Sequence, residues 1–217
     1  MKIIGLSAAV AIAAISTPAL AQETGPSFNG PRIEARVGWD SPDLRVTLSD
    51  GTDSISRSAS KSGVTYGGEI GYDYSPDNKF VIGGYVGLEE STTKSCSELY
   101  GEDRACLKAG RNITAGARVG AVVQDSFLLY GKGGYSNGRT SVTYRDYELI
   151  LADVDEGKNF DGFHLGAGVE GDLAGGIYGR LEYVYSSYGK TSVAADDFSA
   201  SLKPTRHQIV YGMGIRF

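Results

Sequence analysis

The last ten residues, Gln208-Ile209-Val210-Tyr211-Gly212-Met213-Gly214-Ile215-Arg216-Phe217, decide the fold class. Every odd position holds a large apolar or aromatic side chain, and every even position except Val210 holds glycine or a polar residue. Successive side chains of a β-strand point to opposite faces, so a period of two places all the odd residues on one face. The segment therefore predicts a strand with one apolar face and one polar, glycine-rich face.

Seven more segments repeat this two-residue period. In residues 80–89, for example, Phe80, Ile82 and Val86 alternate with residues that include two glycines and a glutamate. Together with the C-terminal segment, the seven predict eight strands and an all-β fold. The segments are residues 33–39, 64–74, 80–89, 111–123, 127–135, 163–170 and 177–185.

The connections between these segments alternate in length. Short, turn-like connections occupy residues 75–78, 124–126 and 172–176. Long polar connections occupy residues 41–62, 91–109, 137–159 and 190–205. Strict alternation is what antiparallel up-and-down strands produce, because every long loop then lies at one end of the sheet and every short turn at the other.

The two faces differ in a way that favours a membrane barrel over a soluble one. Glycine makes up 31 of the 217 residues, about twice its average share of ~7%, and it concentrates on the polar face. The apolar face carries aromatic residues near strand ends, such as Trp39, Tyr72, Tyr74 and Phe217. Apolar bulk outside, small and polar residues inside and aromatic borders are typical of an eight-stranded antiparallel up-and-down transmembrane β-barrel. The alternative is a periplasmic lipocalin-like barrel, which also alternates.

The N-terminus indicates export. Lys2 precedes an apolar run from Ile3 to Ile15, and small residues precede a cleavage point after Ala21. This pattern predicts a signal peptide at residues 1–21 and a barrel domain at residues 22–217. The formal net charge of −5 gives no basic footprint for nucleic acid.

The chain resembles the small eight-stranded outer-membrane barrels of Gram-negative bacteria, namely the OmpA-like and OmpX-like barrels and the opacity-type "porin family" proteins. Two stretches carry the resemblance, residues 210–217 with Phe last and residues 129–136. The resemblance implies a bacterial outer-membrane location, with outer-membrane lipid and lipopolysaccharide as surroundings. It also implies that the barrel assembly machinery reads the last strand, with Tyr211, Ile215 and Phe217 as the signal.

Ten charged residues fall on the polar, inward face of the predicted strands. Five are acidic and five are basic, so we expect a balanced network of ion pairs, because an unpaired charge away from water is costly. An interior of eight strands is only wide enough for side chains to fill. A lumen plugged by these residues is therefore the favoured interpretation, with His164 beside them. They are Glu34, Arg36, Glu69, Glu89, Arg118, Lys132, Glu170, Arg180, Glu182 and Arg216.

A narrow channel for small solutes is the alternative, because the many inward glycines leave space inside the barrel. Surface loops on a rigid scaffold are common binding sites, and the resemblance includes adhesins. We therefore expect a structural and surface-interaction protein whose surface ligand the sequence does not identify. Cys96 and Cys106 both fall in the second long loop, and export favours a disulfide between them.

No cofactor, metal or catalytic site is predicted. Residues 166–171 match the G-x-G-x-x-G pattern, but they lie inside a strand and not before a helix. The acidic stretch from Asp153 to Asp161 is more typical of a solvated loop than of a calcium site. A remote alternative is a lipid-A acyl hydrolase, which would need Ser187 opposite His207 on the last two strands. We therefore expect that the protein is not an enzyme.

Overall fold

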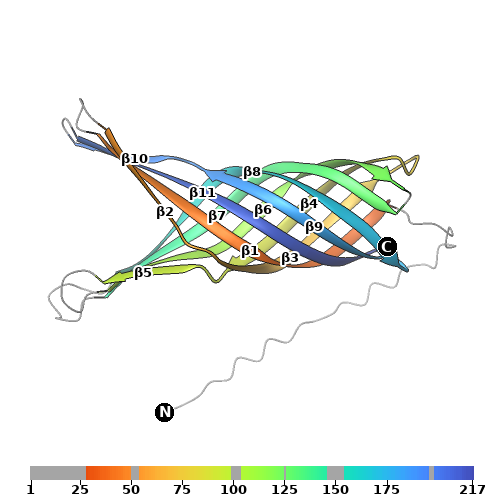
Figure 1. The fold of residues 1–217 in the computed structure, drawn as a ribbon, viewed down its shortest axis with the longest axis horizontal. Coiled ribbons are helices and arrows are strands. Elements are labelled where there is room, and N and C mark those ends of the chain that lie inside the picture. Colours follow the sequence, from red (N-terminus) through yellow and green to blue (C-terminus); the bar gives the residue numbers. More distant parts are fainter. Residues whose placement is uncertain (1–27, 50–53, 99–103, 125, 146–153, 196–197) are drawn as a thin grey trace, which may run out of the picture.

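The computed structural model describes residues 28–49, 54–98, 104–124, 126–145, 154–195 and 198–217. The predicted signal peptide, residues 1–21, lies outside the described residues. The described part is a single antiparallel sheet that closes on itself (Figure 1). Its segments are β1 (Gly30–Ser49), β2 (Ser54–Ser60), β3 (Gly63–Tyr74), β4 (Phe80–Ser91), β5 (Lys94–Glu98), β6 (Arg104–Val123), β7 (Phe127–Arg145), β8 (Val154–Ala174), β9 (Ile177–Tyr188), β10 (Thr191–Ala195) and β11 (Phe198–Arg216).

Eight strands form the closed ring. They are β1, β3, β4, β6, β7, β8, β9 and β11, and each pairs with its neighbours on both sides. The other three segments prolong ring strands after breaks of two residues. Lys61 and Ser62 separate β2 from β3, Thr92 and Thr93 separate β4 from β5, and residues 189–190 separate β9 from β10. The predicted eight-stranded up-and-down topology is confirmed.

The ring closes where the first strand meets the last. β1 pairs with β11 over a register that runs from Arg32 opposite Arg216 to Ser49 opposite Ser199. Beyond that ladder, the backbone N–H of Phe217 donates to the carbonyl of Pro31 at 3.0 Å. Among the described ring strands, closure leaves no sheet edge in the lipid-facing region, where an unpaired backbone group would find no partner. None of the described residues forms a helix long and apolar enough to cross a membrane.

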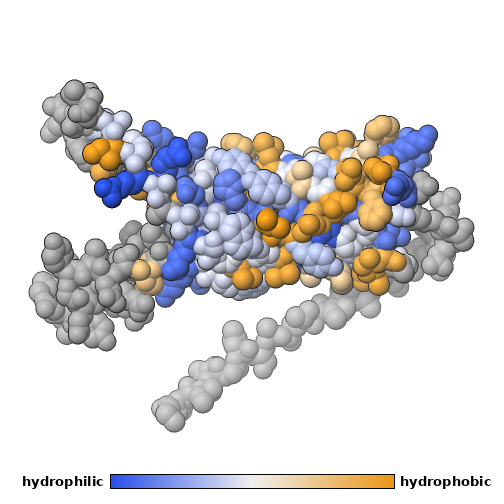
Figure 2. Space-filling model, in the orientation of Figure 1, coloured by the Kyte–Doolittle hydropathy of each residue, from blue (hydrophilic) through white to orange (hydrophobic). Residues whose placement is uncertain are grey.

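Large apolar side chains cover the outside of the barrel. Ile70, Ile82 and Val119 are each about 60% exposed, and orange apolar surface spreads over the strands toward the C-terminal end in Figure 2. The inward positions of the same strands are buried and mostly polar. A soluble barrel would reverse this arrangement, so the lipocalin-like alternative is wrong.

The short turns have the chemistry that tight hairpins require. Gly175 and Gly176, with φ of +59° and +81°, join β8 to β9 as a two-residue loop that needs positive φ at both positions. In the β3–β4 turn, the Asp77 carboxylate accepts backbone N–H groups of Lys79 at 3.0 Å and Phe80 at 3.2 Å. These two hydrogen bonds lower the pKa of Asp77 below its ordinary value.

The long connections are largely β-structure, which corrects the expectation of long polar loops. Five strands continue well past the apolar region and pair there with neighbouring strands. They are β1, β6, β7, β8 and β11. The β3–β4 ladder ends at the pair Thr65–Ser91, and the β8–β9 ladder ends at the pair Gly162–Tyr188. Beyond these two pairs the described strands separate into two arms, visible at the left of Figure 1. The first arm joins β10, β11, β1 and β2, and the second joins β5, β6, β7 and β8. The sequence missed this because residues outside the membrane need not alternate in polarity.

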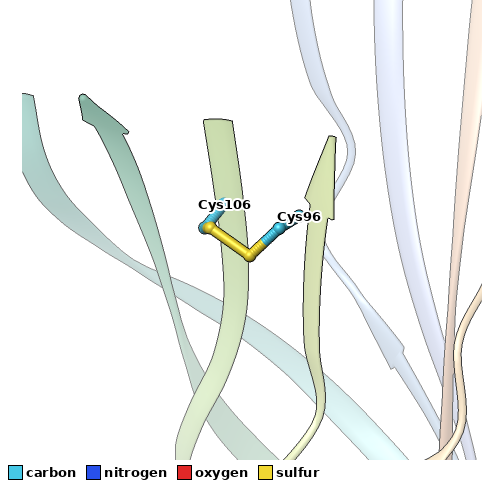
Figure 3. The surroundings of a disulfide bond; sticks show 2 residues. All are labelled: Cys96 and Cys106. Carbon is cyan, nitrogen blue, oxygen red and sulfur yellow. A yellow bond between two sulfur atoms is a disulfide. The ribbon is translucent and has the colours of Figure 1, made fainter. Parts of the chain in front are cut away.

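A disulfide braces the second arm. Cys96 on β5 lies directly opposite Cys106 on β6, and the two sulfurs are bonded, as Figure 3 shows. The predicted pairing is confirmed. The bond lies between two strands of an outer hairpin and not at a loop tip, so it ties the short strand β5 to the long strand β6.

The glycines of the ring set the distance between strands, and one substitution tests this. A Cβ at Gly134 would meet the backbone of Ala115 and Gly116, whereas a Cβ at Gly131 on the same strand would lie 3.9 Å from the Gly166 carbonyl oxygen. We expect Gly134→Ala to destabilise the refolded barrel by about 1–3 kcal/mol. Gly131→Ala should leave the urea unfolding midpoint in micelles nearly unchanged. Equal midpoints for the two variants would contradict the argument.

Candidate functional site

The interior of the barrel is the most highly organised polar region of the described chain. All ten charged residues predicted to face inward are buried there, none of them more than 9% exposed. Glu34 and Arg36 lie two residues apart on β1, as Arg180 and Glu182 do on β9, so each of these pairs shares one face. The other six lie singly on β3, β4, β6, β7, β8 and β11. Strand alternation turns each of them inward, and closure of the ring brings them together.

A cluster near the C-terminal end of the barrel is built on two carboxylates. The Asp73 carboxylate accepts two hydrogen bonds from Arg118, at 2.9 and 2.6 Å, and one from Arg216, at 3.1 Å. Glu170 pairs with the same two arginines, at 2.7 Å and 2.5 Å. Arg32 joins this cluster to the next, because it contacts Asp73 at 3.2 Å and Glu69 at 2.7 Å.

The middle of the lumen is organised around Glu69 and Glu182. Arg36 bonds to Glu69 at 2.7 Å and to Glu182 at 2.6 Å, and Lys132 contacts the same two carboxylates at 2.9 and 3.1 Å. Arg180 reaches Glu69 at 3.0 Å. Each cation thus bridges carboxylates that come from strands far apart in the sequence.

The remaining predicted residues attach to the margins of this middle group. Glu34 pairs with Arg180 at 2.8 Å, and Glu89 pairs with Arg36 at 3.3 Å. Gln208 also donates to Glu89 at 3.2 Å. The structure therefore brings all ten predicted residues into one connected network.

Sequence reasoning missed two members of the network, Arg32 and Asp73. Asp73 lies in the predicted strand at residues 64–74 but is not among the ten charges predicted to face inward, and Arg32 lies one residue before the first predicted strand. With them the connected network holds six acids and six bases. The parity of positions 32, 34 and 36 is the signal that would have found Arg32.

A separate pair lies nearer the arms. Arg206 donates to both carboxylate oxygens of Asp40, at 2.5 and 3.0 Å, and Ser91 donates to the same carboxylate at 2.5 Å. This pair was also missed, because the predicted strands ended at residue 39 and began again after residue 205. Continuing the alternation of β1 and β11 to residues 40 and 206 places both side chains inside the barrel.

The inward glycines are matched by long side chains from other strands. A Cβ at Gly71 would lie 2.8 Å from Nη2 of Arg32, one at Gly168 would lie 2.7 Å from the hydroxyl of Tyr130, and one at Gly116 would lie 2.7 Å from the hydroxyl of Tyr85. Similar contacts oppose Gly212 with Glu34 and Gly214 with Tyr178. Side chains therefore occupy the space that the absence of a Cβ leaves at these positions.

An apolar layer that the sequence did not predict lies at the end of the lumen near the short turns. Phe28, Val81, Leu128 and Tyr130 pack together there, each at most 5% exposed. Tyr130 connects this layer to the charged network, since its hydroxyl donates to Glu182 at 2.7 Å. The guanidinium of Arg118 lies 5.0 Å from the centre of the same ring.

His164 lies in the lumen, where its position was expected. Its Nε2 forms a hydrogen bond with the hydroxyl of Tyr85, and its Nδ1 lies 2.8 Å from the hydroxyl of Ser136. Both ring nitrogens are therefore occupied by neutral partners. Lys132 lies above the Tyr85 ring, with its ammonium 4.1 Å from the ring centre.

Ser187 does not lie opposite His207, which the acyl-hydrolase alternative requires. β9 and β11 pair with Ile177 opposite Ile215, so His207 lies opposite Tyr185, and Ser187 lies opposite Thr205. The assumed register was wrong by two residues. His207 Nδ1 instead lies 2.7 Å from the Tyr183 hydroxyl. Among the described residues there is no cluster of three metal-ligating side chains; Asp153 of the acidic stretch lies outside them.

The proposed assembly signal lies on the outer face of the last strand. Tyr211 pairs with Val37 and Ile215 with Ile33 in the closing ladder, and Phe217 follows the strand end. All three side chains are about half exposed or more. They are therefore accessible from the lipid side.

Removing one cation tests the energetic coupling of the network. Arg180→Met leaves Glu34 and Glu69 with one fewer positive neighbour in a water-poor interior, so we expect a loss of about 3–5 kcal/mol in unfolding free energy. Urea unfolding of the refolded barrel measures it. Arg139→Met, at an exposed outer position, should change stability by less than ~0.5 kcal/mol. Adding Glu34→Gln to Arg180→Met should restore part of the loss; strict additivity of the two substitutions would contradict direct coupling.

Comparison with known proteins gives the chain its family. The "22 kDa outer membrane protein" of Rhizobium leguminosarum bv. viciae is 33% identical over 110 residues, which span 51% of this chain and 48% of that protein, about half its length. The "31 kDa outer-membrane immunogenic protein" of Brucella melitensis biotype 1 is 26% identical over 226 residues, with coverage of 98% of this chain and 93% of the relative.

Among solved structures, the outer membrane protease OmpT from Escherichia coli matches with a TM-score of 0.52 at 9% identity. The match covers 87% of this chain and 97% of that one, and it shows the fold alone. The family model described as "Outer membrane protein beta-barrel domain" matches residues 7–217, which confirms the resemblance seen in the sequence. The chain therefore belongs to the outer membrane protein beta-barrel domain family and is an integral protein of the bacterial outer membrane.

Proposed function

We propose that this protein is a non-enzymatic structural and surface-interaction barrel, in which the lumen is plugged and the two outer arms carry the interaction. The observation that supports the plug best is the fit between inward glycines and long side chains from other strands. The twelve-member charged network then lies above an apolar layer at the end near the short turns. An ion would have to displace paired charges and a packed apolar group in turn.

The arms support the surface role. In outer-membrane barrels the short turns face the periplasm and the long connections face outside, so both arms project from the cell. Their described residues form paired strands, and one arm is braced by the Cys96–Cys106 bond. A rigid projection loses little conformational freedom when a partner binds it. The Brucella relative is named as immunogenic, and exposure of the corresponding region would suit such a property.

A narrow solute channel remains the competing function, and conductance separates the two. We expect the refolded protein to give no steady current steps in a planar bilayer. A variant in which Glu69, Lys132, Arg180 and Glu182 are all serine removes two acids and two bases, so it keeps the charge balance while it empties the middle of the lumen. That variant should conduct. Reproducible steps from the unmodified, folded protein would overturn the plug.

Replacing a hairpin tests the surface role. We expect bacteria that display a barrel with residues 94–108 replaced by a short Gly-Ser linker to adhere to cultured epithelial cells no better than bacteria without the protein. The lumen variant Glu89→Gln, compared at equal amounts of folded protein on the surface, should adhere like the unmodified protein. Loss of adherence in the lumen variant alone would place the activity inside the barrel instead.

A further inference from the structure

A pocket lies on the outer face of the first arm, outside the lumen described above. It has a volume of about 480 Å³, which is within the usual range for small-molecule sites. Its lining is polar and comes from β1, β2, β9 and β11 near the closing seam. The lining residues are Ser41, Asp43, Arg45, Ser60, Tyr185, Lys203, Thr205 and His207.

The register places this pocket directly above the lipid-facing region. Tyr183, Ile209 and Trp39 oppose one another across β9, β11 and β1, and each is nearly half exposed. They form the last row of large apolar side chains on this side. The next row outward on the same face is Tyr185, His207 and Ser41, followed by Thr205, Asp43 and Ser60, and then by Lys203 and Arg45.

Two cations face each other at the outer side of the pocket. Arg45 on β1 lies directly opposite Lys203 on β11, and such pairs have Cβ atoms about 5 Å apart. Neither residue forms an ion pair with any described carboxylate. Asp43, two residues from Arg45, supplies one negative charge against these two positive ones. Like charges directly opposite each other are destabilising, so an anion between them would relieve the repulsion.

The height of the cation pair indicates which anion. Arg45 lies six residues after Trp39 on β1. This separation is about 20 Å along the strand and ~15 Å along the membrane normal at the usual strand tilt. A phospholipid headgroup region is only about 5–8 Å thick on each side. A phosphate at the level of Arg45 and Lys203 therefore belongs to a larger, saccharide headgroup.

We infer that this pocket binds the phosphorylated saccharide headgroup of an outer-leaflet glycolipid. Arg45 and Lys203 hold the phosphate, since guanidinium and ammonium groups are strong phosphate partners. The hydroxyls of Ser41, Ser60 and Thr205 bond to sugar hydroxyls, and Tyr185 supplies an amphipathic wall at the membrane border. The acyl chains of the same lipid then lie along the row that contains Trp39. The site is independent of whether the lumen conducts.

Trp39 provides the readout, because it is the chain's single tryptophan and lies in the row beneath the pocket. The full barrel is refolded into phosphatidylcholine vesicles that contain a minor fraction of deep-rough lipopolysaccharide with spin-labelled acyl chains. We expect the spin-labelled lipopolysaccharide to quench Trp39 fluorescence more strongly than the same lipid does after dephosphorylation. It should also quench more strongly than spin-labelled phosphatidylglycerol. Replacing both cations, Arg45→Gln with Lys203→Gln, should weaken the association at least about tenfold.

The matched control changes the same charge on the other arm. Lys94 and Lys108 also lie directly opposite each other, on β5 and β6, but they line no part of this pocket. Lys94→Gln with Lys108→Gln should leave the quenching unchanged. Equal loss in both double variants would mean diffuse attraction and overturn the site. Displacement of the lipid by millimolar inorganic phosphate, or equal quenching by phosphatidylglycerol, would also overturn it, because a free anion or any anionic lipid would then suffice.

Discussion

The absence of hydrogen-bonding partners in lipid is the constraint on which the rest of this structure depends. It requires the backbone of the spanning region to pair with itself, so the sheet must close. The β1–β11 seam meets that requirement, and the Phe217 N–H extends it by one bond past the ladder. Closure in turn separates two environments. The outward face must be apolar, and the charged residues are left with one another inside.

Size then decides how the interior is filled. A ring of eight strands has little internal width, and a dozen charged side chains occupy the middle of this one. Glycines on one strand give room to arginine, glutamate and tyrosine side chains from another. The balance of six acids and six bases keeps each charge near an opposite one. This packing is what the proposed plug of the lumen depends on.

Beyond the lipid the constraint is lifted, and the structure changes character. Water satisfies exposed backbone groups, so the ring opens between the arms, and short strands such as β2, β5 and β10 pair on one side only within the described sheet. On the second arm, the disulfide between Cys96 and Cys106 links two strands covalently. In the membrane-spanning part, closure of the ring holds the strands together instead. The seam between β1 and β11 continues unbroken from the lipid into the first arm, and it carries the polar pocket with it.

The sequence by itself determined the strand number, the topology, the faces and ten of the twelve network residues, because a two-residue period read over eight segments leaves little freedom. It also placed Cys96 and Cys106 in one connection. Only the tertiary structure decided which charges meet, since Glu69 and Arg180 belong to strands more than a hundred residues apart. Only register placed His207 opposite Tyr185 instead of Ser187, and a shift of two residues leaves the alternation pattern unchanged. The arms could not be predicted from the sequence for a different physical reason: outside the membrane, a strand keeps its backbone pairing without needing an apolar face.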